Sequence, residues 1–143
     1  MRSIPALLVV ALFTACGPAD EPAEQASGPT LADFAGAWQN TVMVEGTEEP
    51  IMSTMGGSAD GSDWKMTLEG RPDIPVQVSM MGDSLIAVTA EYESVLRAGV
   101  MVTVRTASVL SDGMLMGNMV ATYRMPDGQE QVMGTLHGMR APN

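Results

Sequence analysis

The sequence is poor in the residues on which most catalytic and disulfide-stabilised proteins depend. It contains one cysteine, one histidine and two each of tryptophan, tyrosine and phenylalanine among 143 residues. A single cysteine cannot form a disulfide within the chain, and no cluster of cysteine and histidine is present that would hold zinc. No nucleophile-elbow motif and no glycine-rich phosphate loop is found. The sequence therefore predicts neither an enzyme nor a cofactor, and its stability must come from a packed core.

Basic residues are also scarce. Seven lysines and arginines face 17 aspartates and glutamates, which gives a formal net charge of −10. A surface of this sign repels the phosphates of nucleic acids and the headgroups of anionic lipids. We therefore expect no nucleic-acid partner.

Long apolar runs are absent as well. The apolar run at residues 4–13 is too short to cross a bilayer, which needs about 20 residues. It follows the positive charge of Arg2 and precedes the small residues Thr14 and Ala15, as in a signal peptide. An uncleaved anchor and ordinary secretion are the alternatives.

The first residues resemble a bacterial lipoprotein signal, because Cys16 directly follows Leu12-Phe13-Thr14-Ala15. The resemblance implies a signal peptide over residues 1–15 and lipidation of Cys16. Two acyl chains are about what stable anchoring requires. The expected partner of the N-terminus is therefore a membrane, and the expected location is the cell envelope. In such lipoproteins Gly17, after the cysteine, favours the outer membrane, here facing the periplasm.

The next segment, residues 17–29, contains three prolines and no large apolar side chain. It cannot bury enough surface to fold and is typical of a tether, so that residues 16–29 are expected to form the lipidated cysteine and a disordered linker. The folded domain is then expected over residues 30–143. Thr30 and Asp33 have the spacing of a capping box, which predicts a helical turn at its start.

From Trp38 onward the chain alternates between apolar and polar residues, as at Trp64, Met66 and Leu68, and turn pairs interrupt it. This pattern is typical of an antiparallel sheet. The sequence predicts an all-β domain, an eight-stranded antiparallel up-and-down β-barrel, with an open sandwich as the alternative. The predicted strands are 37–45, 50–57, 62–69, 74–81, 84–92, 100–110, 114–124 and 129–140.

Gly36-Ala37-Trp38 opens the first predicted strand, and it resembles the Gly-x-Trp signature of lipocalins and related calycin barrels. The resemblance implies that Trp38 plugs one end of a lipocalin-like barrel beneath a short helix. It also implies that an arginine from the chain's end stacks on this indole. Arg140 is the first candidate and Arg124 the second, and such stacking is worth about 0.5–2 kcal/mol.

An eight-stranded barrel can hold one small ligand or be filled by its own side chains. We expect the protein to bind a small apolar or amphipathic molecule in the barrel. The alternative is a structural or protein-interaction module with a filled barrel. The candidate ligand-binding residues are Trp64, Met66, Val78, Met80, Val102, Val104, Met116 and Val120, with Tyr92, Arg97 and Tyr123 nearer the mouth.

The alternation breaks between Tyr92 and Val102. This segment is either a lid or rim contact at the barrel mouth or a structural corner. In the corner, Arg97 is expected to pair with Glu91 or Glu93.

Methionine is abundant, with 14 in the chain. Its flexible thioether suits a pliable core or an apolar pocket, and an oxidant sink is a further alternative. Another alternative is a soft-metal site for Cu(I), since thioethers favour that ion. It requires a turn that pairs Arg124 with Gln129, and its ligands would be Met114, Met116, His137 and Met139.

Overall fold

The computed structural model of the chain describes residues 27–142. The expected signal segment 1–15, Cys16 and most of the expected linker lie outside the described residues. Within them, no helix is long and apolar enough to cross a bilayer.

Residues 27–142 form one short helix, α1 (Leu31–Phe34), and nine strands. The helix begins as predicted: the carboxylate of Asp33 accepts hydrogen bonds from the backbone N–H of Thr30 at 2.7 Å and from its hydroxyl at 3.0 Å. The strands are β1 (Gly36–Val44), β2 (Ile51–Gly57), β3 (Lys65–Thr67), β4 (Ile74–Met81), β5 (Ser84–Thr89), β6 (Tyr92–Glu93), β7 (Met101–Ser111), β8 (Met114–Met125) and β9 (Gly128–Arg140).

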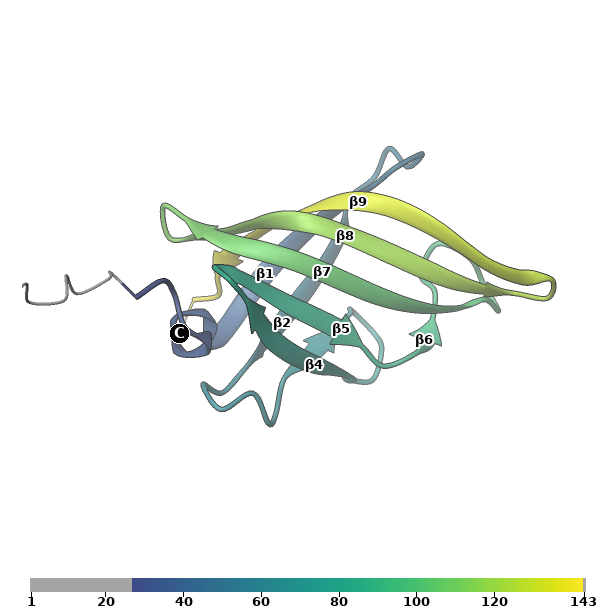
Figure 1. Cartoon of the computed structure of the whole chain (residues 1–143). Helices are drawn as coiled ribbons and strands as arrows, with labels where there is room; N and C mark the ends of the chain where they lie inside the picture. Colours follow the sequence, from purple (N-terminus) through teal and green to yellow (C-terminus); the bar gives the residue numbers. More distant parts are fainter. Residues whose placement is uncertain (1–26, 143) are drawn as a thin grey trace, which may run out of the picture.

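Eight of these strands close into a barrel in which each pairs with its neighbours antiparallel (Figure 1). Neighbouring strands follow each other along the chain, except that β5 pairs with β7 and β9 returns to β1. The two-residue β6 adds to the end of β7. This is the predicted up-and-down barrel, and the open sandwich is excluded.

The two ends of the barrel differ. Helix α1 and the end of β9 lie together at one end, whereas β6 and the long β8–β9 hairpin lie at the other (Figure 1). We call the first the closed end and the second the mouth.

Two strands differ from the prediction. The strand expected over 62–69 is shortened to β3, because residues before Lys65 form a loop: Asp63 accepts a hydrogen bond from the backbone N–H of Ser58 at 2.6 Å, and Asp60 accepts one from Ser62 at 2.9 Å. The strand expected over 84–92 ends at Thr89. The other six agree within a residue or two.

A one-residue irregularity explains the second difference. Val88 of β5 pairs with Arg105, and Tyr92 pairs with Val102. The chain therefore advances four residues from Val88 to Tyr92, whereas β7 advances only three between the two partners. This extra residue is a β-bulge, a feature that re-aims side chains at barrel rims. The freed N–H of Val104 donates instead to the Thr89 hydroxyl at 2.9 Å. The bulge turns Tyr92 to the same side as the buried Thr89.

The barrel interior is filled by a single apolar cluster. Inward and outward residues alternate along the strands, as the pleat requires. The most deeply buried side chains, each less than 2% exposed, include the polar side chains of Asn40 and Ser108. Asn40 Oδ1 and Ser108 Oγ have no hydrogen-bond partner among the described residues. The most deeply buried side chains are Trp38, Phe34, Leu85, Leu115, Asn40 and Ser108.

Candidate functional site

The closed end is held by Trp38 and Arg140. The Trp38 indole is 1% exposed, and its Nε1 donates to the carbonyl of Phe34 at 2.7 Å. The Arg140 guanidinium lies 4.0 Å from the centroid of the Trp38 ring. It also donates to the carbonyl of Asp33 at 2.6 Å and to that of Ala35. The stacking expected of Arg140 is therefore present, and it ties the last strand to the helix.

Gly36 is required beside this stack. Its φ is +105°, in the region that favours glycine. A Cβ at this position would lie 2.9 Å from Arg140 Nη1. The glycine of the Gly-x-Trp motif therefore permits both the backbone turn and the approach of the arginine.

Residues 93–100 fold over the mouth, and we call them the lid. Ser94 is buried, its N–H donates to the carbonyl of Val100 at 2.8 Å, and its hydroxyl accepts from the N–H groups of Leu96 and Arg97 at 3.0 and 3.2 Å. Gly99 donates to the Glu93 carboxylate at 3.0 Å. The lid thus holds its shape largely through its own hydrogen bonds.

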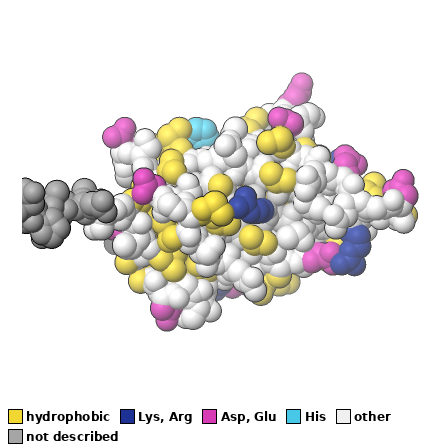
Figure 2. Space-filling model, viewed as in Figure 1, with side chains coloured by type: hydrophobic (Ala, Val, Ile, Leu, Met, Phe, Trp, Pro, Cys, Tyr) yellow, Lys and Arg dark blue, Asp and Glu magenta, His cyan; other side chains and the backbone are white. Residues whose placement is uncertain are grey.

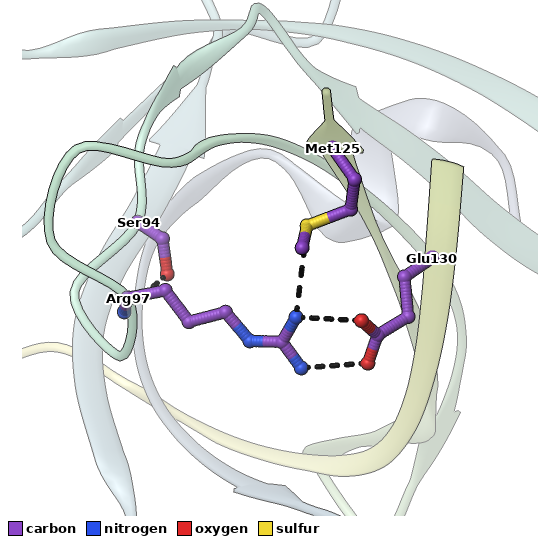
Figure 3. Close-up of polar contacts among 4 residues, drawn as sticks. All are labelled: Ser94, Arg97, Met125 and Glu130. Atoms are coloured by element: carbon purple, nitrogen blue, oxygen red, sulfur yellow. Dashed lines mark hydrogen bonds and ion pairs between the residues drawn. The ribbon is translucent and has the colours of Figure 1, made fainter. Parts of the chain in front are cut away.

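Arg97 fastens the lid to the far side of the mouth (Figure 3). Its two terminal nitrogens donate to both carboxylate oxygens of Glu130 on β9, at 2.9 and 2.7 Å. The guanidinium also lies 4.1 Å from the centroid of the Tyr123 ring. These hydrogen bonds hold the pKa of Glu130 below its ordinary value.

The local pairing predicted for Arg97 is therefore wrong. Glu91 forms an ion pair with Arg124 instead, and the carboxylate of Glu93 accepts from the lid backbone. Arg124, the second candidate for the stack on Trp38, is engaged at the opposite end of the barrel. Residues 92–102 thus contain a structural corner that lies over the mouth, and their contact with a ligand stays a prediction.

A cleft of about 410 Å³ opens beside the lid, and we call it the mouth cleft. It separates the β3–β4 loop from β6. Arg71 bridges the two sides, because its Nη1 donates to the carbonyl of Glu93. Residues 71–75 and 91–93 line the cleft.

Charges in the mouth cleft are unevenly matched. Its acid Asp73 accepts hydrogen bonds from Lys65 at 2.6 Å and from Thr67 at 2.8 Å, and Glu91 is paired with Arg124. Among the described residues, no carboxylate lies within ion-pair distance of Arg71. Among the described residues, the guanidinium of Arg71 and the carboxylate of Glu93, which accepts from the N–H of Gly99, therefore have no ion-pair partner, and the other walls of the cleft include prolines and Tyr92.

The phenol of Tyr92 has an altered acidity in this setting. Its pKa is raised to about 12, first by burial and then by the charge that would form on Tyr123, while Arg71 opposes the shift. The phenol is therefore neutral at physiological pH and presents an apolar ring with a hydrogen-bonding tip.

The predicted interior residues occupy the barrel, but they contact one another. Trp64, Met66, Val102, Val104 and Tyr123 belong to the buried cluster, and Val78 and Met80 pack against it. Five clefts at the surface of the described residues have linings that do not include Met66, Val102 or Val104.

Two residues predicted to line the interior do not. On β8 the inward positions are taken by Leu115, Met119 and Ala121, which are buried in the core. Met116 and Val120 alternate with these and lie on the outer face, where Met116 is 39% exposed. The outer face of β8 also carries apolar residues, among them Met116 and Val120, so the alternation does not distinguish inside from outside at these positions.

A larger cleft of about 640 Å³ lies in the barrel wall. It arises because β3 is short and leaves much of β4 without a strand partner on that side. Trp64 is part of its lining, and its Nε1 donates to the carbonyl of Ser58 at 2.8 Å. No arginine or lysine lines this cleft.

The register required for a methionine–histidine cluster is confirmed. Arg124 pairs with Gln129, and Met116 lies opposite His137. Within residues 27–142, no group of three or more His, Cys, Asp and Glu side chains could hold a metal ion.

Arg71 and Glu130 are the residues that the sequence reasoning missed. Arg71 lies in Gly70-Arg71-Pro72-Asp73, whose residue types indicate only a turn. No sequence signal marks Arg71, because only the structure shows that the neighbouring acid Asp73 is paired with Lys65. No local signal marks Glu130, because it lies 33 residues from Arg97.

No protein-family model matches the chain, and neither curated proteins nor solved structures include a match to it.

Proposed function

We propose that this protein is a lipid-anchored envelope protein with a lipocalin-like barrel, and that it binds a small amphipathic anion at the barrel mouth. The observation that carries the proposal is Arg71, a guanidinium without an ion-pair partner among the described residues, facing a cleft of about 410 Å³. The cleft is within the size range of small-molecule sites.

The chemistry of the mouth cleft fits a molecule with two unlike ends. Arg71 can donate to a carboxylate or phosphate, and a guanidinium does so with a fork of parallel hydrogen bonds. Ile74, Pro75 and the ring of Tyr92 offer an apolar wall beside it. The lid borders the cleft at Glu93, so that release of the Arg97–Glu130 pair would widen the entrance.

The lipocalin-like assignment is supported by the closed barrel and by the stack of Arg140 on Trp38. For the N-terminus, the signal-like residues support lipidation of Cys16 and insertion of its acyl chains in a membrane. Gly17 favours the outer membrane. Mass spectrometry of the mature N-terminus tests this part: a diacylated Cys16 is expected, and an unmodified cysteine would overturn the anchor.

The ligand proposal is tested with dodecanoate as the probe. Native mass spectrometry of protein purified from its own envelope is expected to show a bound amphipathic anion, and calorimetry is expected to show dodecanoate binding. Arg71→Gln should weaken this binding about tenfold or more, the effect of losing a charged hydrogen bond. The uncharged dodecanol should bind weakly to both proteins.

The matched control is Arg105→Gln. Arg105 is exposed on β7 and also has no ion-pair partner among the described residues, so that its replacement makes the same change in net charge. It should leave dodecanoate binding within about twofold of wild type. Equal binding by wild type and Arg71→Gln, or no binding at all, would refute the site.

The second candidate is a structural or protein-interaction module with a filled barrel. It is favoured by the packed interior and by the apolar side chains on the outer surface. Protein that is purified without any small molecule and fails to bind dodecanoate would support this alternative. The residues concerned are Met43, Met52, Val109, Met116, Met133 and Met139, each at least 39% exposed.

A further inference from the structure

His137, the only histidine in the sequence, lies on the outer face of β9 among exposed methionines. Figure 2 shows the imidazole at the surface beside hydrophobic side chains. This place is at the closed half of the barrel wall and is separate from the mouth cleft.

The backbone register brings an imidazole and a thioether together. The Met133 carbonyl of β9 accepts from Glu45 at 2.9 Å, and Ala141 donates to the carbonyl of Ala37 at 2.9 Å. Odd-numbered residues of β9 therefore direct their backbone groups toward β1. Met116 and His137 consequently form a non-hydrogen-bonded pair between β8 and β9, the type in which the Cα atoms approach to about 4.5 Å.

The surroundings of His137 contain no charge. Eight positions on the outer face are nearest to it: those directly and diagonally opposite on the two neighbouring strands, and the two flanking it on β9. Four of these positions are methionines, and the other four are uncharged polar residues. These positions are Met114, Met116, Asn118, Thr135, Met139, Gln39, Thr41 and Met43.

Such a neighbourhood is unusual for a chain with 17 acidic residues. Hard and borderline cations are bound by carboxylates, carbonyls or clustered cysteine and histidine, whereas thioethers favour soft ions such as Cu(I). A neutral set of thioethers and one imidazole suits a soft monovalent cation. We define the thioether–imidazole cluster as Met114, Met116, His137 and Met139.

These methionines are not core fillers. Met116 is 39% exposed and Met139 is 58% exposed. The thioether has three rotatable bonds, which allow it to turn toward a bound ion. The paired strands hold the Cα positions, and the flexible side chains supply the reach.

We propose that the thioether–imidazole cluster binds one Cu(I) or Ag(I) ion, with His137 and Met116 as its central ligands. The opposed pair provides the imidazole and one sulfur, and Met114 and Met139 lie at the flanking positions of the same two strands. This site is independent of the proposed ligand site at Arg71.

The test is an anaerobic titration of the full chain with Cu(I) against a chromophoric chelator. It is made in a Cys16→Ser background, because a free thiol would itself bind the ion. One ion per chain is expected, and Met116→Leu and His137→Gln should each weaken binding at least about tenfold. Leucine matches the size of methionine, so that the fold of the first variant is retained.

The matched control is Met81→Leu, which removes a more exposed thioether, 64% exposed, on β4. It should leave Cu(I) affinity within about twofold of the parent protein. With methyl-labelled methionine, Ag(I) should shift the resonances of Met114, Met116 and Met139 and leave that of Met81 in place. Absence of a stoichiometric ion, or equal affinity in all three variants, would overturn the proposal.

Discussion

Arg140 provides the sharpest test of how the barrel is held together. Replacement of Arg140 with glutamine removes the cation above the Trp38 ring and the fork that donates to the carbonyls of Asp33 and Ala35. The shorter glutamine side chain is uncharged and has one nitrogen in place of the two that donate to these carbonyls. The helix would then be linked to the end of β9 by much weaker contacts.

The size of the effect follows from the interactions lost. Stacking of a guanidinium on an indole is worth about 0.5–2 kcal/mol, and a hydrogen bond from a charged donor adds about 1.5–3 kcal/mol. Arg140 itself is exposed, which reduces both contributions. We expect a loss of about 2–3 kcal/mol from the free energy of unfolding, a large part of the 5–15 kcal/mol that is typical of a domain.

Urea unfolding followed by tryptophan fluorescence measures this loss. Arg140→Lys should recover less than half of it, since an ammonium lacks the planar fork. Arg105→Gln, the exposed control on β7, should change stability by no more than about 0.5 kcal/mol. If Arg140→Gln unfolds at the same urea concentration as this control, Arg140 does not stabilise the barrel in this way.

Three further outcomes are expected. Gly36→Ala should destabilise the fold more than Gly46→Ala, because both have positive φ but only Gly36 faces the guanidinium; equal midpoints in urea would contradict this. Tyr92 binds its proton more tightly in the folded protein, where its pKa is about 12 against the ordinary 10.0. Between these pH values the unfolded chain ionises first, so the free energy of unfolding should fall as pH rises, by no more than about 2 kcal/mol. Phenolate absorbance and unfolding of Tyr92→Phe, which should lack this dependence, measure it. The pKa of Glu130 is lowered in the folded protein. The Arg97–Glu130 pair therefore stabilises the lid fully above the pKa that Glu130 has in the unfolded chain, and this stabilisation is lost as the pH falls through the pKa of the folded protein. Lower protection of lid amides against hydrogen exchange, relative to their intrinsic rate, is expected in acid and in Glu130→Gln already at neutral pH, and unchanged protection would count against it.

The strands could be predicted because each is bounded by a short turn, and because polar and apolar residues alternate on most of them. The plug at Trp38 could also be anticipated, because three adjacent residues carry the motif. On β8 the alternation failed as a guide. Leu115 and Met116 are both apolar, so only the barrel's curvature decides which one faces inward.

The candidate site was harder to predict because it depends on distant contacts. The partner of Arg97 is Glu130, which no local spacing connects to it, whereas Glu91 and Glu93 are close in sequence and were the natural expectation. The β-bulge before Tyr92 has no sequence marker in this chain. Arg71 becomes conspicuous only when the partners of its neighbouring acids are known.

The β-bulge has a consequence for how the molecule opens. Beyond it, β6 contributes two residues to the sheet, and the lid is stabilised mainly by hydrogen bonds within itself and by one ion pair. We therefore expect the lid to detach as a separate cooperative unit at a smaller free energy than the barrel needs to unfold. Native-state hydrogen exchange should divide the described amides into two populations, one that exchanges when the lid opens and one that exchanges only when the barrel unfolds. The boundary between them is expected at the β-bulge, between Thr89 and Tyr92.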